Sequence, residues 1–441
     1  MPSASPTLRR ETTLTLLFTR GEEVALHSLT TAQTSYYGAN VLEAAREAGL
    51  SGTLLRRLYF KYFGEVAGVR RAESVWHLEA ADGLELDWQP ISGLPQRERA
   101  WVDTAHSPPG NAPWMRPGWH AAALAWLDAE LAAQGWTRQG QAGQPSVLKH
   151  GQISVLWRVD TSGGRVYFKA VPDFFRREVE VTPLLARELP GAAPSVLAAD
   201  TRRGFLLLRD AGEENDTPDL SAVMRHLAGI QRASLPLLDG WALRDRGPDH
   251  VLSWLDRLLS DATLLTGQEG GFTPGEAERL RSHAPELEAA LRRLSASPLP
   301  CTLGHGDLHG GNVVERGGRF TFLDWSDVCV THPFLDASPA YFLGFGEMDD
   351  LGESQLEALA AATAAYLHAW TDFAPLEELR ALFNDALTAG ELLRALGYVD
   401  GIQPAVQDKT EWHGAHLEHL RRALTRLEKG EAPVSSGSLT L

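Results

Sequence analysis

Apolar and polar residues alternate over short stretches of the first 105 residues, which is the pattern of half-buried β-strands. The predicted strands are Thr13–Phe18, Val24–Ser28 and Ser74–Glu79. Between them, Asn40–Ala48 has helical spacing and stops at Gly49, a residue common at helix ends. The pattern predicts a separate α/β domain over residues 1–105.

Two further blocks follow a segment rich in proline and glycine, which predicts a linker over residues 106–118. Residues 119–210 begin with a helical pattern, and the pattern after it predicts two strands, a helix and two more strands. The predicted elements are a helix Trp119–Gln134, strands Ser154–Val159 and Val166–Val171, a helix Phe174–Leu189, and strands Ser195–Ala199 and Gly204–Leu208. This order predicts a small α+β lobe.

Helical periodicity dominates residues 211–430, with a single β-like patch at 313–323. Residues 431–441 are short of apolar side chains and predict a flexible tail. The fold class is therefore α+β, with a small β-rich lobe and a large helical lobe after the N-terminal domain. A chain of 441 residues is long enough for two or three such domains.

Composition narrows the functional class. No apolar run approaches the roughly 20 residues needed to span a bilayer, so we expect no membrane partner. Two cysteines cannot form a disulfide framework, which favours the reducing cytoplasm. The net charge of −16 argues against nucleic acid as a partner. The oligomeric state cannot be read from the sequence.

The negative charge is concentrated in the second half of the chain. Residues 1–210 carry 23 Lys and Arg and 22 Asp and Glu, a net charge of +1. Residues 211–441 carry 18 and 35, a net charge of −17. One interpretation is that these acidic side chains only solvate the surface.

The stretch His305-Gly-Asp-Leu-His-Gly-Gly-Asn312 precedes the β-like patch, and Asp324-Trp-Ser-Asp327 follows it. Gly317-Gly318 favours a two-residue hairpin turn. That turn would set residue 313 opposite 322 and bring Asn312 and Asp324 to the open end of one hairpin. Two oxygen donors side by side can bind Mg²⁺. Asp307 would then lie close enough to orient a hydroxyl group and take its proton.

These motifs resemble the aminoglycoside phosphotransferase and choline kinase family, over roughly residues 110–430. The resemblance implies a two-lobed protein-kinase-like fold, ATP and Mg²⁺ as cofactors, and a small-molecule acceptor. It implies that Asp307 is the catalytic base and that Asn312 and Asp324 are metal ligands. His305, His309 and Asp327 would support the loop and the metal-site strand.

The same resemblance assigns the nucleotide site. Lys169 ends a predicted strand, where the family places a lysine for the ATP phosphates. Glu178 on the next helix would pair with it, and Glu180 is the alternative. The phosphate-covering loop would be centred on Gly151–Ser154, and the backbone from Leu208 to Asp210 would bind adenine. The sequence departs from the protein-kinase pattern in having one glycine in that loop and Asp-Trp-Ser at the metal site.

The N-terminal block resembles the end of the Nudix box at Leu42-Glu-Ala-Ala-Arg-Glu-Ala-Gly-Leu50. Glu43 and Glu47 match, but Arg46 replaces a metal-binding glutamate, which should cripple metal binding. The pattern fits an inactive Nudix-like domain and an ordinary amphipathic helix equally well.

The leading hypothesis is an ATP-dependent small-molecule kinase that phosphorylates a hydroxyl group. A nucleotide-binding regulatory pseudokinase and an N-terminal hydrolase of nucleoside diphosphate compounds remain as alternatives. The acidic half, including Glu347, Asp349 and Asp350, favours an acceptor that is neutral or cationic.

Overall fold

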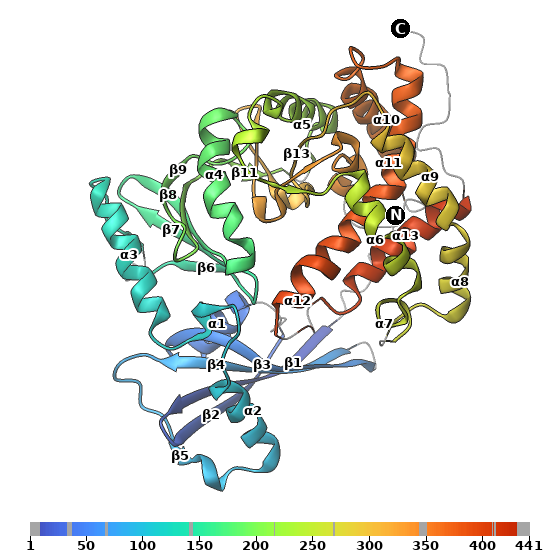
Figure 1. Ribbon diagram of the computed structural model, residues 1–441. Helices are drawn as coiled ribbons and strands as arrows, with labels where there is room; N and C mark the ends of the chain where they lie inside the picture. Colours follow the sequence, from blue (N-terminus) through green and yellow to red (C-terminus); the bar gives the residue numbers. More distant parts are fainter. Residues whose placement is uncertain are drawn as a thin grey trace, which may run out of the picture. The chain divides into compact units, whose positions relative to one another are not determined.

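The computed structural model describes residues 9–32, 38–66, 69–140, 144–215, 217–267, 270–343, 351–407, 409 and 412–429. The chain forms two compact units (Figure 1). Unit 1 combines the described residues up to Asp173 with Leu197–Arg209. Unit 2 combines Phe174–Val196 with the described residues from Asp210 onward.

The first sheet of unit 1 has the strand order β3-β4-β1-β2-β5. Its elements are β1 (Arg9–Arg20), β2 (Glu23–Thr31), α1 (Gly38–Glu47), β3 (Gly52–Val66), β4 (Val69–Ala80), β5 (Gln89–Pro90) and α2 (Gln96–His106). Strand β1 is central and runs parallel to β4. Leu16 packs with Val41 of α1, whereas Leu17 packs with Trp101 of α2. Because neighbouring strand residues face opposite ways, one helix covers each face.

The sequence pattern did not predict strand β3. The strand is long and carries register shifts between Leu54 and Arg56, Arg57 and Tyr59, and Tyr62 and Gly64. Each bulge inserts an extra residue and breaks the two-residue alternation that marks a strand. Helix α2 was also not predicted. The proline- and glycine-rich segment that follows it, residues 106–118, led instead to the prediction of a linker.

The second sheet of unit 1 has the order β6-β7-β8-β10-β9. Its elements are α3 (Trp119–Ala133), β6 (Ser146–His150), β7 (Val155–Thr161), β8 (Gly164–Ala170), β9 (Val196–Asp200) and β10 (Phe205–Arg209). Thr161 pairs with Gly164, which confirms the predicted hairpin. Trp126 of α3 packs on Phe168 and Phe205 of the sheet at 5.8 and 5.3 Å between ring centroids.

Hydrogen bonds connect the first sheet of unit 1 with β6 and with the end of α2, and Trp114 with the β6–β7 turn. The His150 Nε2 atom is 2.8 Å from the Leu55 carbonyl oxygen, and the Trp114 indole donates to the Gly151 carbonyl at 2.7 Å. The Arg56 guanidinium donates to the carbonyls of Ala105 and Ser107 at 2.5 and 2.7 Å, where α2 ends. The domain boundary at 106–118 stays a prediction within this compact unit.

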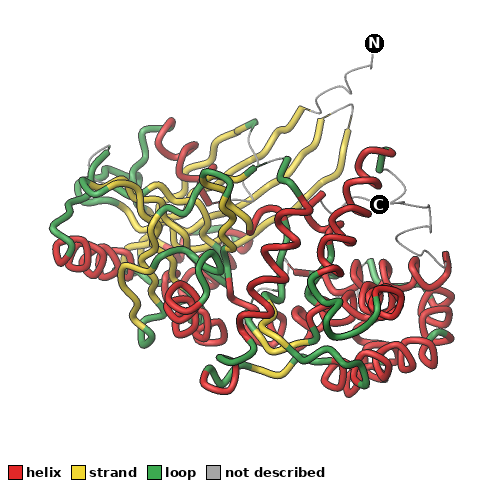
Figure 2. Tube along the Cα trace, turned by 90° about the horizontal axis from the view of Figure 1, so that it is seen from above, coloured by secondary structure: helices red, strands yellow, loops and turns green. Residues whose placement is uncertain are grey.

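Unit 2 is mainly helical; Figure 2 draws the helices of the chain in red and its strands in yellow. Its helices are α4 (Arg176–Glu188), α5 (Leu220–Ser234), α6 (Pro248–Ser260), α7 (Ala262–Leu265), α8 (Pro274–Ser282), α9 (Ala284–Ser295), α10 (Glu353–His368), α11 (Leu376–Leu396), α12 (Gln403–Ala405) and α13 (Ala415–Lys429). They enclose one core, in which Tyr366, Trp370 and Phe383 are almost fully buried. No helix in the described part of the chain is long and apolar enough to cross a membrane.

Two three-stranded sheets lie within unit 2, in the orders β11-β14-β15 and β12-β16-β13. The strands are β11 (Glu213–Glu214), β12 (Arg244–Asp245), β13 (Thr302–Gly304), β14 (Val313–Arg316), β15 (Arg319–Phe322) and β16 (Cys329–Thr331). A π-helical turn, Gly397–Ile402, follows α11. The remaining helical turns are short 3-10 segments, of which Gly310–Asn312 and Trp325–Asp327 flank the hairpin.

Candidate active site

The β14–β15 hairpin has the predicted register. Gly317 and Gly318 form its two-residue turn with φ angles of 58° and 75°, a backbone that glycine adopts at no steric cost. Val313 pairs with Phe322, and the Leu323 N–H donates to the Asn312 carbonyl at 2.8 Å. The segment that enters the hairpin at Asn312 and the segment that leaves it towards Asp324 therefore lie side by side.

A buried carboxylate anchors the loop between β13 and the hairpin. The backbone N–H groups of His305 and Gly306 donate to the two oxygens of Asp336 at 2.7 and 2.8 Å. Asp336 is 2% exposed. Hydrogen bonds to a charged acceptor are stronger than neutral ones, so this pair fixes the backbone immediately before Asp307.

His305 is a structural residue of this loop. The Asp307 N–H donates to its Nδ1 at 3.4 Å, so the proton is on Nε2, which donates to the Leu323 carbonyl at 2.7 Å. Burial lowers the pKa of His305, although the carboxylates of Asp336 and Asp307 act in the opposite direction. The neutral ring thereby connects the loop to the end of the hairpin.

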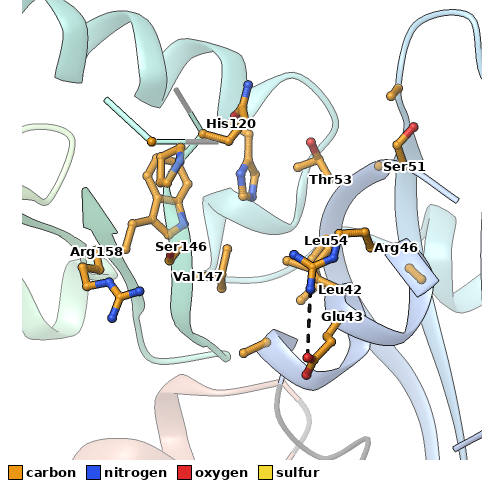
Figure 3. Close-up of a pocket in the computed structure, with 18 of the residues that line it drawn as sticks. Leu42, Glu43, Arg46, Ser51, Thr53, Leu54, His120, Ser146, Val147 and Arg158 are labelled. Carbon is orange, nitrogen blue, oxygen red and sulfur yellow. Dashed lines mark ion pairs between the residues drawn. The ribbon is translucent and has the colours of Figure 1, made fainter. Parts of the chain in front are cut away.

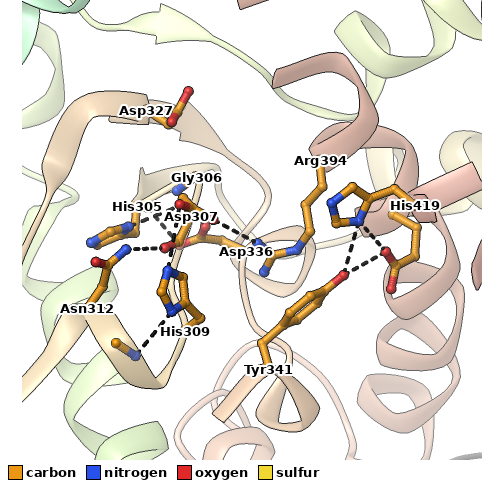
Figure 4. A network of polar contacts seen from close by, with 12 residues as sticks. His305, Gly306, Asp307, His309, Asn312, Asp327, Asp336, Tyr341, Arg394 and His419 are labelled. Carbon is orange, nitrogen blue, oxygen red and sulfur yellow. Dashed lines mark hydrogen bonds and ion pairs between the residues drawn. The ribbon is translucent and has the colours of Figure 1, made fainter. Parts of the chain in front are cut away.

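Asp307 projects from the loop with its side chain 53% exposed (Figure 4). The Asn312 amide donates to the Asp307 carbonyl at 2.9 Å, which orients the amide oxygen away from that bond. His309 Nε2 lies 3.9 Å from the Asp307 carboxylate, and His309 Nδ1 accepts from the Gly311 N–H. The loop therefore brings together four of the predicted residues, His305 included.

Asp324 lies two residues after the end of β15 and has a φ of 58°, which is uncommon for a residue other than glycine. Its carboxylate and the Asn312 amide oxygen are hard donors of the type that Mg²⁺ prefers. No cluster of three or more His, Cys, Asp and Glu side chains suited to a metal occurs among the described residues. Two protein ligands nevertheless fit Mg²⁺, because this ion is usually bound by one or two carboxylates together with phosphates and water.

Asp327 lies in the turn after Asp324, close to the loop. A Cβ atom on Gly306 would lie 2.5 Å from the Asp327 carbonyl oxygen, so only glycine fits there. Burial raises the pKa of Asp327 to about 6, and the nearby Asp307 carboxylate adds to the effect. A cavity of about 60 Å³ opens beside both carboxylates.

Arg394 lies beside Asp307, a position that the sequence did not indicate. It comes from α11, its side chain is 7% exposed, and its Nη1 lies 3.9 Å from Asp307 Oδ1. Its guanidinium carbon lies 3.8 Å from the centroid of the Tyr341 ring. Figure 4 shows Arg394 directed at Asp307 from the side opposite Asn312.

A buried acidic centre holds this arginine and tyrosine in place. The Tyr341 hydroxyl donates to Glu391 at 2.6 Å, and His419 Nδ1 lies 2.8 Å from the same oxygen. Burial alone would raise the pKa of Glu391, but His419, Tyr341 and the nearby Arg426 hold it below its usual value. The network provides a rigid wall on one side of Asp307.

The same cavity is lined by Arg246, Arg394 and Tyr398, the last from the π-helical turn. Arg246 is also paired with Asp400 at 3.1 Å. Single π-helical turns in α-helices are often found at functional sites. The carboxylates proposed to face an acceptor from this region, Glu347, Asp349 and Asp350, lie outside the described residues.

Four predicted nucleotide-site residues lie in unit 1. Lys169 is on β8, paired with Leu206 of β10, and is 7% exposed. Gly151 and Ser154 form the β6–β7 turn, where the Gly151 N–H donates to the Ser154 carbonyl at 3.0 Å. Leu208 lies on β10 opposite Tyr167.

The other two nucleotide-site residues lie in unit 2. Glu178 is in the first turn of α4 and is 2% exposed, whereas the Glu180 side chain is 41% exposed and pairs with Arg177. Asp210 pairs with Arg316 of the hairpin at 2.7 Å. Burial therefore distinguishes the two glutamates that the sequence left as alternatives.

A β-rich sheet with a helical part, and a loop-hairpin unit bearing Asp, Asn and Asp, define a phosphotransferase of protein-kinase-like fold. The chain belongs to the phosphotransferase enzyme family, whose model matches residues 144–382. The predicted family is thereby confirmed. The search of curated proteins gave no match, and the Nudix-like interpretation of the N-terminal block stays a prediction.

Solved structures give further similarities. One is a choline/ethanolamine kinase family protein from Mesorhizobium loti, with 16% identity, a TM-score of 0.47, and coverage of 70% of this chain and 98% of that one. Choline kinase from Cryptosporidium parvum has 13% identity, a TM-score of 0.48, and coverage of 70% and 97%. Macrolide 2'-phosphotransferase from Brachybacterium faecium has 18% identity, a TM-score of 0.40, and coverage of 68% and 97%.

Proposed function

We propose that the protein is an ATP-dependent kinase that transfers the γ-phosphoryl group to a hydroxyl of a small molecule. The observation that carries the proposal is the loop-hairpin unit, in which Asn312 donates to the Asp307 backbone at 2.9 Å and lies opposite Leu323, next to Asp324. This is the arrangement that a base and two metal ligands require.

Asp307 is the proposed base. Its exposed carboxylate accepts the proton of the acceptor hydroxyl as the oxygen attacks phosphorus. Asp336 and His305 hold the loop backbone, and this supports a fixed position for that carboxylate. Phosphoryl transfer depends mainly on alignment and on charge stabilisation.

Asn312 and Asp324 are the proposed Mg²⁺ ligands. When bound, the ion would neutralise charge on the nucleotide phosphates. Lys169 is the proposed phosphate-binding cation, and Glu178 is its proposed partner, with Gly151 and Ser154 near the phosphates. The burial of Glu178 supports that choice over the exposed Glu180. Leu208 to Asp210 would bind adenine through the backbone.

A hydroxylated small molecule that is neutral or cationic is the proposed acceptor class. The charge asymmetry of the sequence supports this class. The cavity beside Asp307 is lined by Asp307, Asp327, Arg246 and Arg394, and Arg246 is paired with Asp400 at 3.1 Å. Three carboxylates therefore stand against two arginines, which disfavours an anionic acceptor. The two free cysteines support a cytoplasmic location.

The test is ATP consumption by the full-length protein in a screen of small hydroxylated metabolites, with Mg²⁺ present. Asp307→Asn should reduce turnover by roughly 10² to 10⁴ and leave nucleotide binding nearly intact. Asp385→Asn, which removes the carboxylate that pairs with the exposed Arg293, is the control and should not change turnover. Equal turnover in the wild type and Asp307→Asn would refute the assignment.

The regulatory alternative predicts a different result, namely nucleotide binding without ATP consumption under any acceptor. The hydrolase alternative centres on α1, where Arg46 lies 4.0 Å from Glu43. That ion pair places a cation beside a candidate metal ligand, which disfavours metal-dependent hydrolysis. Release of phosphate from nucleoside diphosphate compounds that persists in Asp307→Asn would restore this alternative.

A further inference from the structure

Unit 1 contains a cavity of about 760 Å³ that has no part in the proposed phosphoryl transfer (Figure 3). Its walls come from α1, the beginning of β3, α3 and the β6–β7 pair. Every lining residue belongs to unit 1, and both of its sheets contribute. The volume lies within the range of sites that bind small organic molecules, roughly 300 to 1,000 Å³.

Three nitrogen atoms of lining residues are buried without a hydrogen-bond partner in the described part of the chain. They are His120 Nε2, Trp157 Nε1 and Arg158 Nε. Trp157 is 1% exposed, so water does not reach its indole freely. Buried polar atoms are nearly always hydrogen-bonded, and three exceptions around one cavity point to a ligand.

These three atoms determine which hydrogen-bonding groups a ligand of the cavity must carry. The indole N–H and the guanidinium N–H are donors and need acceptors on the ligand. Burial lowers the pKa of His120 to about 3, so its ring is neutral, and a hydrogen bond to the Leu54 backbone raises that pKa. The bond therefore uses the ring N–H, which leaves Nε2 as an acceptor that needs a donor.

The charge of the cavity favours an anion. Arg158 has no ion pair among the described residues, whereas Arg46 at the margin pairs with Glu43. Asp160 also lines the cavity, but Arg165 lies 3.5 Å from its carboxylate. An arginine without a carboxylate partner is suited to a planar anionic group.

The remaining surface is apolar and aromatic. Leu54 and Val147 line it together with His120, as Figure 3 shows. The centroids of the His120 and Trp157 rings are 5.1 Å apart. A flat ring system can pack on such a wall.

We propose that this cavity binds a small aromatic organic anion. Its acidic group would bind Arg158, a separate acceptor on the ligand would bind the Trp157 N–H, and a donor would bind His120 Nε2. Its ring would pack against Leu54 and Val147. The site lies wholly in unit 1 and is independent of Asp307 and its loop.

The probe is 8-anilinonaphthalene-1-sulfonate, which has aromatic rings, an N–H donor and an anionic group. Fluorescence titration of the full-length protein should give one saturable site that saturating Mg²⁺-ATP does not displace. Val147→Trp, which places a bulky ring in the part of the cavity next to Trp157, should weaken binding at least about tenfold. Leu148→Trp on the same strand is the matched control, because Leu148 is 42% exposed and does not line the cavity.

Arg158→Gln tests the charge separately and does not depend on filling the cavity. It should weaken the anionic probe about tenfold but leave the neutral N-phenyl-1-naphthylamine unchanged. Thermal unfolding of each variant checks that it is folded. The proposal is overturned if the wild type does not bind the anionic probe, if ATP displaces it, or if folded Arg158→Gln binds it as the wild type does.

Discussion

Replacing Gly306 with alanine probes the backbone that presents Asp307. Gly306 has a φ of +84°, and an added Cβ would lie 2.5 Å from the Asp327 carbonyl oxygen and 2.6 Å from the Asp327 Cβ. Both neighbours belong to a buried segment, so neither can swing aside as a flexible side-chain end could. The Gly306 N–H is also one of the two donors to Asp336.

The expected cost has two parts. A residue with a Cβ pays about 1 to 2 kcal/mol to adopt a left-handed backbone. Overpacking a tight contact adds about 1 to 3 kcal/mol. The free energy of unfolding should therefore fall by about 2 to 5 kcal/mol. Turnover should fall about 10²-fold, because a displacement of about 1 Å at a reacting group has that effect.

Urea unfolding and ATP turnover measure the two effects on one preparation. Gly317→Ala is the matched control, since Gly317 also has a left-handed φ, of +58°, but a Cβ there would meet nothing within 4 Å. It should cost only about 1 kcal/mol and leave turnover unchanged. If Gly306→Ala matched Gly317→Ala in both measurements, the close approach to Asp327 would not constrain the loop.

Three other changes have definite expected outcomes. Asp324→Ala should abolish most Mg²⁺-dependent ATP affinity in calorimetry and Asn312→Ala should reduce it less, because an amide ligand carries no charge; equal losses would contradict this ranking. Lowering the pH from 7 to 4 should destabilise the fold by up to about 3 kcal/mol through His150. Burial holds the pKa of His150 at about 4, so the unfolded chain binds the proton first as the pH falls, and His150→Gln should flatten this decline in a urea series. In a fragment of residues 110–441 the strands β6 to β8 should lose protection from hydrogen exchange, because the fragment lacks the Leu55 carbonyl that His150 contacts; protection equal to that of the full-length protein would contradict this.

The loop that carries Asp307 and the hairpin after it could be predicted because residues close together in the sequence determine their structure. Gly317-Gly318 determines the turn, and the turn determines that residue 313 faces 322. Asp307 and Asn312 follow from spacing within one octapeptide. A motif of this kind needs no knowledge of which distant segments pack together.

Arg394 and Asp336 were not predictable in the same way. Asp336 lies in an apolar run, and nothing in its spacing indicates that it binds two backbone N–H groups 30 residues earlier. Arg394 has the sequence position of an ordinary polar residue on a long helix, where solvent exposure is the usual outcome. Its burial depends on Tyr341 and Glu391, which are brought together by tertiary packing.

The chain passes between the two units three times, after Asp173, Val196 and Arg209. During synthesis, β8 leaves the ribosome well before β10, the strand that must pair with it. Until residue 209 emerges, β8 presents an open strand edge and Phe168 lacks Leu207 opposite it. Exposed edges of this kind promote aggregation. The rate of translation just beyond residue 209 should therefore influence the yield of soluble protein more than the rate over any part of the later helical region.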